Sequence, residues 1–234
     1  MPVTFHANYG RGINSVDARA VVYRPDQPRI GTTDFFQTGI SSAMGRLAFS
    51  ADAFLIDHAH EQVYIPDDGT FEFQGPSRAY GYEAKTSIQL THHISLNAGV
   101  TKVGNAFFKG GETRTYVTNA PHFVANAALT VSQWSGWSGS LRMRAINHYR
   151  LDGEDPSILA AGNTVFDFAV ARQVRKGVEL NFSVDNLLNR NYYETQNYGE
   201  SAVAPNAPVI ARIHGTPGYS TTFVAGITLR LGEK

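Results

Sequence analysis

Apolar and polar residues alternate along most of this chain, and this two-residue period constrains the fold more than any other feature. Residues 47–55, 123–131 and 223–231 each carry apolar side chains at every second position. Successive side chains of a strand point to opposite faces, so such segments predict strands with one apolar and one polar face. Helical periodicity is nearly absent, and residues 155–163 hold at most one helical turn. The alternation predicts an all-β protein of about ten strands, at residues 3–12, 32–43, 46–57, 78–92, 94–105, 116–133, 138–150, 163–174, 178–186 and 219–231.

The connections between these strands alternate between long and short. The long ones are residues 13–31, 58–77, 106–115, 151–162 and 187–218, and the short ones lie near Gly45, His93, Trp134–Trp137 and Lys176. In an up-and-down antiparallel meander, every second connection lies at the same end of the sheet. Long loops at one end and tight turns at the other are typical of outer-membrane β-barrels, with apolar residues outside and polar residues inside.

Composition excludes several other classes of protein. The formal net charge is zero, which argues against a nucleic-acid partner, and the absence of cysteine excludes disulfides and thiolate metal sites. No segment approaches the roughly 20 consecutive apolar residues of a transmembrane helix. Residues 1–14 carry no signal-peptide pattern, so we expect either a cytoplasmic protein or the later part of a longer chain.

Four sequence motifs resemble those of TonB-dependent outer-membrane receptors. Residues 184–194, VDNLLNRNYYE, are similar to the family's Asn-Leu signature, with its residues at Asn186, Leu187, Leu188, Asn189 and Tyr192. Residues 77–90 resemble the Gly-aromatic-Glu strand, and residues 119–131 resemble the Asn-x-Pro strand opening. The last strand resembles the terminal strand that the outer-membrane assembly machinery recognises. The motifs fall in the family's order and cover most of the chain.

The resemblance implies part of a transport receptor rather than an enzyme. Plugged outer-membrane transporters have about 22 strands. At roughly 23 residues for each strand with its connection, such a barrel needs about 500 residues. Residues 1–234 are therefore expected to be the C-terminal part of a receptor β-barrel, with the plug domain and earlier strands absent. Such receptors sit in the bacterial outer membrane and take up scarce solutes such as ferric siderophores with TonB-derived energy.

The resemblance also implies the partners of the chain. These are membrane lipid and lipopolysaccharide, the missing strands and plug, the TonB complex through that plug, and the assembly machinery through the last strand. We expect no cofactor. In the membrane-spanning strands, the apolar side chains expected to face lipid are Phe49, Leu55, Leu129, Leu141, Met143, Phe182, Ile227 and Leu229. The polar side chains expected to face the lumen are Asp52, Asn126, Arg142, Arg144, Asn181 and Thr228.

One cluster of residues has the composition of a metal site. His58 and His60 are two residues apart, so on a strand their imidazoles share a face, with Asp57 and Glu61 nearby. Two imidazoles and a carboxylate suit Cu(II), Ni(II) or Zn²⁺. A polar strand end that enters a loop explains the same residues, and we consider it the stronger interpretation.

Two other functional classes remain open from the sequence. A small ten-stranded outer-membrane protein, either an adhesin or an omptin-like protease, fits the strand count. The protease would need acidic and histidine residues clustered at the extracellular rim, where only Asp57, His58 and His60 are available. A soluble lectin-like β protein is the third interpretation, and it requires a chain that stays in solution without detergent.

Overall fold

The structure, a computed structural model, describes residues 2–15, 17–23, 26, 28–65, 70–111, 114–204 and 206–230. Ten of its strands form one antiparallel sheet in the order β1-β2-β3-β6-β7-β8-β9-β12-β13-β16. Each strand pairs with the next long strand of the chain, which confirms the predicted meander. The strands are β1 (Thr4–Ser15), β2 (Ile30–Met44), β3 (Leu47–His58), β6 (Ser77–Gln89), β7 (Ile94–Phe108), β8 (Phe123–Trp134), β9 (Trp137–Ile146), β12 (Asn163–Arg175), β13 (Val178–Asp185) and β16 (Thr222–Leu229).

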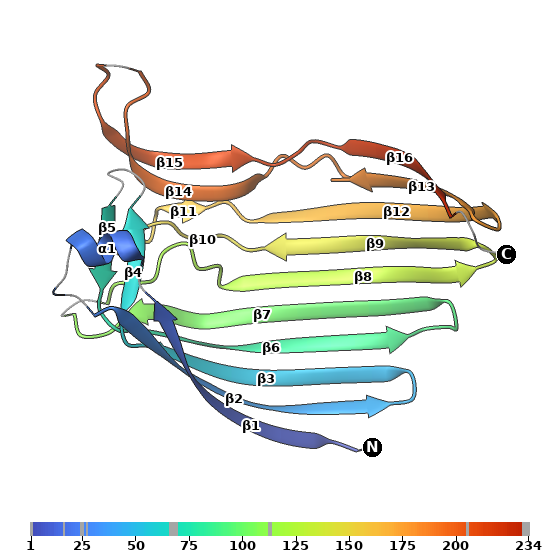
Figure 1. The fold of residues 1–234 in the computed structure, drawn as a ribbon, viewed down its shortest axis with the longest axis horizontal. Coiled ribbons are helices and arrows are strands. Elements are labelled where there is room, and N and C mark those ends of the chain that lie inside the picture. Colours follow the sequence, from blue (N-terminus) through green and yellow to red (C-terminus); the bar gives the residue numbers. More distant parts are fainter. Residues whose placement is uncertain are drawn as a thin grey trace.

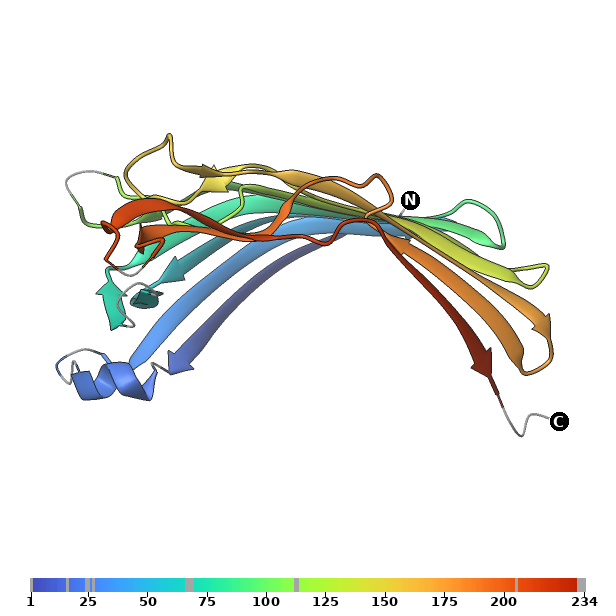
Figure 2. The same cartoon turned by 90° about the horizontal axis from the view of Figure 1, so that it is seen from above.

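The sheet is curved but open (Figures 1 and 2). Along their described residues, β1 pairs only with β2 and β16 pairs only with β13. Each of these strands therefore leaves one edge of backbone donors and acceptors without a partner in the sheet. Among the described residues, the ladder between the first and last strands that a small closed barrel requires is not formed.

Long and short connections are sorted to opposite ends of the sheet, as predicted. The connections that leave β1, β3, β7, β9 and β13 gather at the end where α1, β4, β5, β14 and β15 lie (Figure 1). We call this the loop end and the other the turn end. At the turn end, β8 and β9 are joined by a tight turn in which Ser135 and Gly136 have positive φ angles of 51° and 79°. Trp134 and Trp137 flank that turn and are exposed.

Two predicted strand boundaries are wrong. The strand predicted at 116–133 begins only at Phe123, because Asn119 adopts a left-handed φ of 57° and Pro121 has no backbone N–H to donate. Tyr116 forms only an isolated bridge with Phe107. The strand predicted at 138–150 ends at Ile146, and the following residues pair elsewhere.

The long connections contain secondary structure that the alternation missed. They hold the six-residue helix α1 (Ala18–Tyr23), and the hairpins β4 (Glu61–Ile65) with β5 (Thr70–Gln74) and β14 (Tyr193–Ser201) with β15 (Ile210–Pro217). Residues 155–163 form no helical turn, and instead β11 (Leu159–Ala160) pairs with β10 (Tyr149–Arg150). Within the described residues, no helix has the length and apolarity needed to span a membrane.

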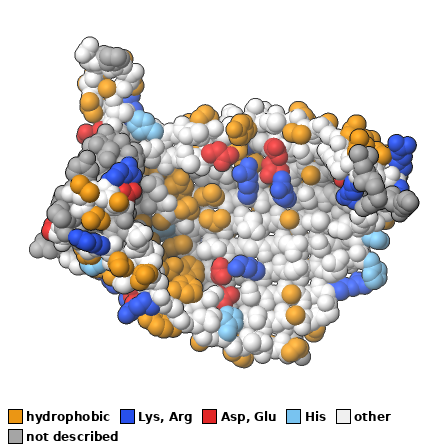
Figure 3. Space-filling view, in the orientation of Figure 1, with side chains coloured by type: hydrophobic (Ala, Val, Ile, Leu, Met, Phe, Trp, Pro, Cys, Tyr) orange, Lys and Arg blue, Asp and Glu red, His pale blue; other side chains and the backbone are white. Residues whose placement is uncertain are grey.

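The strand register gives the sheet one polar and one apolar face. Ladder partners share a face, so the pairs Asp52–Glu83, Asn126–Arg144 and Asn181–Gly226 trace the first face across the sheet. This face is concave, and Figure 3 shows charged groups on it, separated by small or uncharged polar residues. The opposite, convex face carries the residues that we expected to meet lipid, namely Phe49, Leu55, Leu129, Leu141, Met143, Phe182, Ile227 and Leu229.

The sheet encloses almost no hydrophobic core. Its buried apolar residues are Ala106, Leu151, Ala160, Val165 and Val184 only, within the described residues. The chain exposes 15180 Å², whereas a water-soluble monomer of this mass exposes about 10,400 Å². Side chains such as Phe5, Phe223 and Ile227 are at least two-thirds exposed. An apolar face of this extent needs lipid or protein to cover it.

Candidate functional site

The polar residues predicted for the lumen all lie on the concave face of the sheet. The register of β3, β8, β9, β13 and β16 places them there. Each residue either belongs to one of the ladder pairs that define this face or lies two positions from such a residue on the same strand, and side chains two positions apart share a face. The set is Asp52, Asn126, Arg142, Arg144, Asn181 and Thr228. The structure thus brings together on one surface residues that lie far apart in the sequence.

Three of these side chains each lie over a glycine directly opposite on the neighbouring strand. A Cβ on Gly99 would come within 3.3 Å of Asn126 Oδ1, and one on Gly226 within 2.5 Å of Asn181 Oδ1. Asp52 covers its partner Gly39 in the same way. The glycines have no side chain, so the polar group of each opposite residue occupies the space that a Cβ would take.

The charged groups on the β9 to β13 part of the concave face form a connected network. Arg144 Nε lies 3.6 Å from Asp167 Oδ2, and Arg144 also donates to the Tyr192 hydroxyl at 3.4 Å. Tyr192 in turn donates to Glu194 Oε1 at 2.7 Å. Burial, and then this hydrogen bond to Glu194, raise the pKa of Tyr192, so the phenol stays protonated at neutral pH.

Arg142 lines the same region, and no ion pair between described residues includes it. It is exposed and lies beside Asp167 in the ladder, but Asp167 contacts Arg144 and accepts a hydrogen bond from the Asn186 backbone N–H at 3.0 Å. These residues surround an open hollow of about 580 Å³ that also reaches Asp185 and Thr222. The hollow therefore offers both a cationic and an anionic group to the interior side of the sheet.

A second charged cluster lies on β1, β3 and β6. His6 Nε2 hydrogen-bonds Asp52 Oδ1, and Lys85 Nζ lies 3.2 Å from Glu83 Oε1. Asp52 and Glu83 are direct ladder partners, so their carboxylates face each other across adjacent strands. The cations of His6, when protonated, and Lys85 reduce the repulsion between the two acids. Sequence reasoning missed His6, because its partner lies 46 residues away.

Asn186, in the motif at residues 184–194, forms a network of hydrogen bonds at the loop end of β13, which we call the Asn186 lock. Asn186 is 1% exposed and has a left-handed φ of 50°. Its Nδ2 donates to the carbonyls of Arg190 and Tyr219 at 2.9 Å each, and its Oδ1 accepts from the Arg190 N–H at 2.9 Å. Its own carbonyl accepts from the Thr221 hydroxyl at 2.9 Å. One asparagine therefore joins the end of β13 to the segment that begins β16.

The other motif residues support this lock. Asn189 has a φ of 48°, and its Oδ1 accepts from the Thr221 N–H at 3.2 Å. Asparagine tolerates the left-handed region better than other non-glycine residues, which explains two of the three asparagines. Leu187 donates its N–H to the Phe166 carbonyl at 2.7 Å, and the side chains of Leu187 and Leu188 are exposed. The Tyr192 carbonyl accepts from the Gly218 N–H at 2.8 Å.

In the described part of the chain, the candidate metal ligands do not lie close together. β3 ends at His58, whose Nδ1 is 2.9 Å from the Thr33 hydroxyl, and His60 lies beyond the strand, so the shared strand face that we expected is not formed. Asp57 points to the opposite face, where it accepts from Arg78 and Lys109. No group of three or more potential metal ligands occurs in the described part of the chain. Metal binding at His58 and His60 stays a prediction without support.

Comparisons with known proteins agree with this architecture. The family model described as "TonB dependent receptor-like, beta-barrel" matches residues 2–187. No curated protein matches the chain by sequence.

Several solved structures have the same fold. The copper transporter OprC is 19% identical with a TM-score of 0.71, over 97% of this chain and 37% of that one. The ferric yersiniabactin uptake receptor FyuA from Yersinia pestis is 13% identical with a TM-score of 0.71, over 96% and 34%. A mutant of the ferric enterobactin receptor PfeA from Pseudomonas aeruginosa is 14% identical with a TM-score of 0.73, over 97% and 38%.

This chain spans between a third and two-fifths of the length of these three receptors. Members of the matched family are outer-membrane proteins with a plug domain, and they act together with TonB. The match to more than half of the chain, together with the meander and its two faces, shows that the protein belongs to the TonB-dependent receptor β-barrel family.

Proposed function

We propose that residues 1–234 form the C-terminal part of the barrel of an outer-membrane receptor that takes up a scarce solute with energy delivered through TonB. The similar receptors are named for the solutes copper, ferric yersiniabactin and ferric enterobactin. The chain acts as part of a receptor and carries out no chemical reaction. The plug domain and the earlier strands of the barrel lie outside this segment.

The open edges of the sheet are the observation that carries this proposal. β1 and β16 each have one partner in the sheet, and both are mostly exposed along their length. A closed barrel has no such edges, so each of the two strands requires a further strand beside it. A receptor barrel of about 22 strands supplies those neighbours.

The two faces support a position in the membrane. The convex face would contact lipid, and the concave face, with Asp52, Asn126 and Arg142 among its polar groups, would line the lumen around the plug. Arg142 and the hollow beside it would contact the plug or an anionic solute. The convex face would contact lipopolysaccharide in the outer leaflet, and β16 would be read by the assembly machinery.

Uptake by cells that carry the complete gene tests the proposal. Cells with and without the gene are offered radiolabelled ferric enterobactin, ferric yersiniabactin and copper, each with a matched strain that lacks TonB. We expect gene-dependent uptake of at least one of these probes, and loss of that uptake without TonB. A variant that lacks residues 218–230, and with them β16, should abolish uptake because the barrel then cannot close.

Two results would contradict the proposal. The first is uptake by vesicles that contain only residues 1–234, because an open sheet cannot conduct a solute selectively. The second is a chain that remains monomeric in water without detergent, which would support the lectin-like alternative. The small-barrel alternative lacks the ladder between β1 and β16 that it needs.

A further inference from the structure

The hollow of about 580 Å³ on the concave face of β9, β12 and β13 carries groups of both charges. Its lining includes two guanidinium groups and three carboxylates, those of Arg142, Arg144, Asp167, Asp185 and Glu194. Acidic and basic groups lie side by side on the concave face (Figure 3). Because carboxylates outnumber cations, the hollow suits a solute that brings a positive charge as well as a negative one.

Three of these five charged groups already have partners in the structure. Arg144 lies 3.6 Å from Asp167 and donates to the Tyr192 hydroxyl at 3.4 Å. Asp167 also accepts from the Asn186 backbone N–H at 3.0 Å. Tyr192 donates to one oxygen of Glu194 at 2.7 Å, which leaves the second oxygen for another donor. These contacts hold one side of the hollow in place.

Arg142 and Asp185 are the two charges that remain for a ligand. Arg142 is exposed, and no ion pair between described residues includes it. The Asp185 carboxylate is half-buried and, within the described part of the chain, has neither a hydrogen bond nor an ion pair. Burial of a carboxylate without a partner costs free energy that a cationic ligand group would recover. One hollow therefore presents a free cation and a free anion together.

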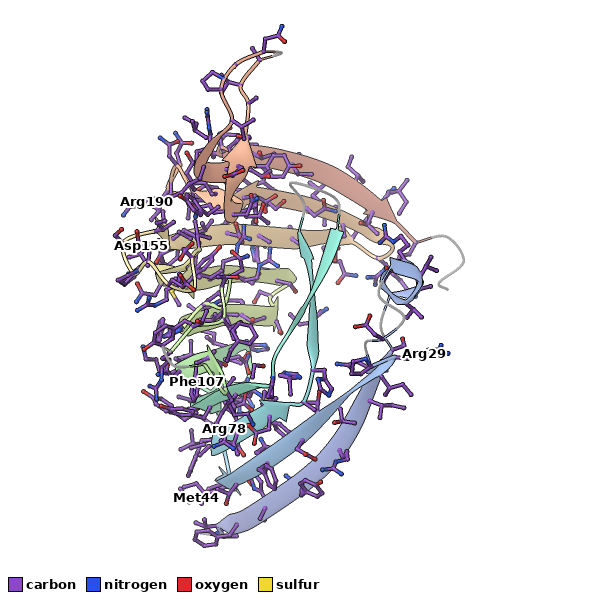
Figure 4. The ribbon with its side chains drawn as sticks, turned by 90° about the vertical axis from the view of Figure 1, so that its left-hand side faces the viewer. Arg29, Met44, Arg78, Phe107, Asp155 and Arg190 are labelled. Atoms are coloured by element: carbon purple, nitrogen blue, oxygen red, sulfur yellow. The ribbon has the colours of Figure 1, made fainter. Side chains whose placement is uncertain are left out.

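The strand register sets the distance between these two charges. Arg142 pairs with Asp167 across β9 and β12, and the register of β12 with β13 places Asp185 beside Asp167. Arg142 and Asp185 therefore lie in one row, two strand spacings or roughly 10 Å apart along the backbone. Seen along the strands, the sheet is an arc (Figure 4). Side chains on its concave face therefore have tips that are closer together than their Cα atoms.

This spacing and the volume of the hollow suit a short peptide. An extended chain advances about 3.3–3.6 Å for each residue, so the two charged ends of a tripeptide lie roughly 10 Å apart. Hollows that bind small molecules commonly measure about 300–1,000 Å³. Tyr219, which also lines the hollow, is 78% exposed and offers an aromatic surface to the side chains of a peptide.

We propose that this hollow binds a second class of solute besides metal complexes, namely zwitterionic peptides of about three residues with free termini. The inference rests on the proposed function, because it requires the concave face to line the lumen of a complete receptor. The planar guanidinium of Arg142 donates to the C-terminal carboxylate of the peptide. The Asp185 carboxylate and the second oxygen of Glu194 accept from its N-terminal ammonium group.

Calorimetric titration of the purified complete receptor in mild detergent tests this site, with trialanine as the probe. The wild-type receptor should bind one molecule of trialanine. Acetylation of the amino end removes the charge that Asp185 contacts, and amidation of the carboxyl end removes the charge that Arg142 contacts. Each blocked peptide should bind about tenfold more weakly, since a hydrogen bond between charged groups is lost.

Two variants connect each end of the peptide to one residue. Arg142→Gln should weaken binding of trialanine about tenfold but bind the amidated peptide as the wild type does, because that contact is already lost. Asp185→Asn should lose the preference for a free amino end and keep the preference for a free carboxylate. Glu179→Gln is the matched control, because Glu179 lies on the same face of β13 toward the turn end, and both preferences should remain.

Three results would overturn the peptide site. They are the absence of trialanine binding to the wild-type receptor, equal binding of trialanine and its two blocked forms, and variants of Arg142 and Asp185 that keep both preferences. The comparison of the three peptides uses only the wild-type receptor, so it decides the question even if a variant does not fold.

Localisation and uptake separate this proposal from the proposed function. A receptor that sits in the outer membrane and imports a metal complex with TonB, yet does not bind trialanine, would overturn the peptide site alone. A receptor that is absent from the outer membrane would overturn both.

Discussion

The side-chain amide of Asn186 donates a hydrogen bond to the backbone carbonyl of Tyr219 at 2.9 Å, across 33 residues of sequence. Between these two residues the chain forms the β14–β15 hairpin, which projects from the loop end (Figure 1). The bond joins the two ends of the segment that contains this hairpin, and it sets the position from which β16 begins. The asparagine of the family motif thus holds the last strand of the sheet in register with β13.

Replacing Asn186 by alanine should release the base of this hairpin. The change removes the donor to two carbonyls and the acceptor for one N–H, in three part-buried hydrogen bonds that are each worth about 1 kcal/mol. We expect faster proteolysis between residues 190 and 221 and a lower unfolding temperature in detergent. Asn191→Ala is the matched control, because Asn191 is exposed in the same motif, and it should behave as wild type. Equal protease sensitivity of both variants would show that Asn186 does not fasten the hairpin.

A methyl group on Gly39 should disturb the concave face. The Asp52 carboxylate and the Ala51 carbonyl oxygen occupy the space above Gly39, so Gly39→Ala must displace both of them, and with Asp52 the contact to His6. The same change at Gly10, on the neighbouring strand, meets nothing within 4 Å. Gly39→Ala should therefore lower the unfolding temperature of the folded receptor in detergent, while Gly10→Ala should not. The interpretation of the glycine as a space for Asp52 would fail if both variants unfolded at the same temperature.

Substitutions that change the charge on β9 should destabilise the folded receptor by different amounts on the convex and concave faces. Leu141→Arg places a cation on the convex face at mid-membrane and should destabilise the folded receptor by about 2–4 kcal/mol. Arg142→Leu removes an exposed cation that pairs with no acid among the described residues, and it should cost much less. Folding free energies measured by urea titration in lipid vesicles check this order. The reverse order would mean that the sheet is inside out.

Acidification should weaken the loop end through His122. Burial and the neighbouring cations hold its pKa below the ordinary value of 6.5, so the folded imidazole resists a proton that the unfolded one accepts. Between these two pKa values the unfolded state binds more protons, and stability therefore falls as the pH drops below about 6.5. NMR titration of labelled histidine should give a pKa below 6.5. In Lys102→Gln the pKa should rise toward that value, and an unchanged pKa would contradict the electrostatic contribution of Lys102.

The alternation of side chains was sufficient to predict the large sheet and its faces. Apolar and polar residues alternate through β3, β8, β9 and β16, and a shift by one residue would have exchanged the faces, so Arg142 and Leu141 could be assigned to opposite sides. The predicted boundary at 116 was wrong because the alternation of side chains does not reveal a residue with a left-handed backbone, such as Asn119.

Contacts between distant segments lay beyond sequence reasoning. Asn186 was identified by resemblance alone, and nothing in its neighbours indicates that it bonds to Tyr219. Likewise, the pairing of His6 with Asp52, and of Arg144 with Asp167, depends on the register of strands that the chain brings together only on folding. The β14–β15 hairpin was missed because its polar residues lie where the apolar period has already ended.

The central claim is that the convex face of this sheet meets lipid while the concave face lines an aqueous interior. Residues 1–234 hold no cysteine, so in a complete receptor with any other cysteine replaced, single cysteines can be placed along β9 and spin-labelled, at Ser140, Leu141, Arg142, Met143, Arg144 and Ala145. In lipid vesicles, labels at 141, 143 and 145 should collide mainly with oxygen, and labels at 140, 142 and 144 mainly with a water-soluble nickel complex. Uniform accessibility along the strand, or alternation with the opposite phase, would contradict the account.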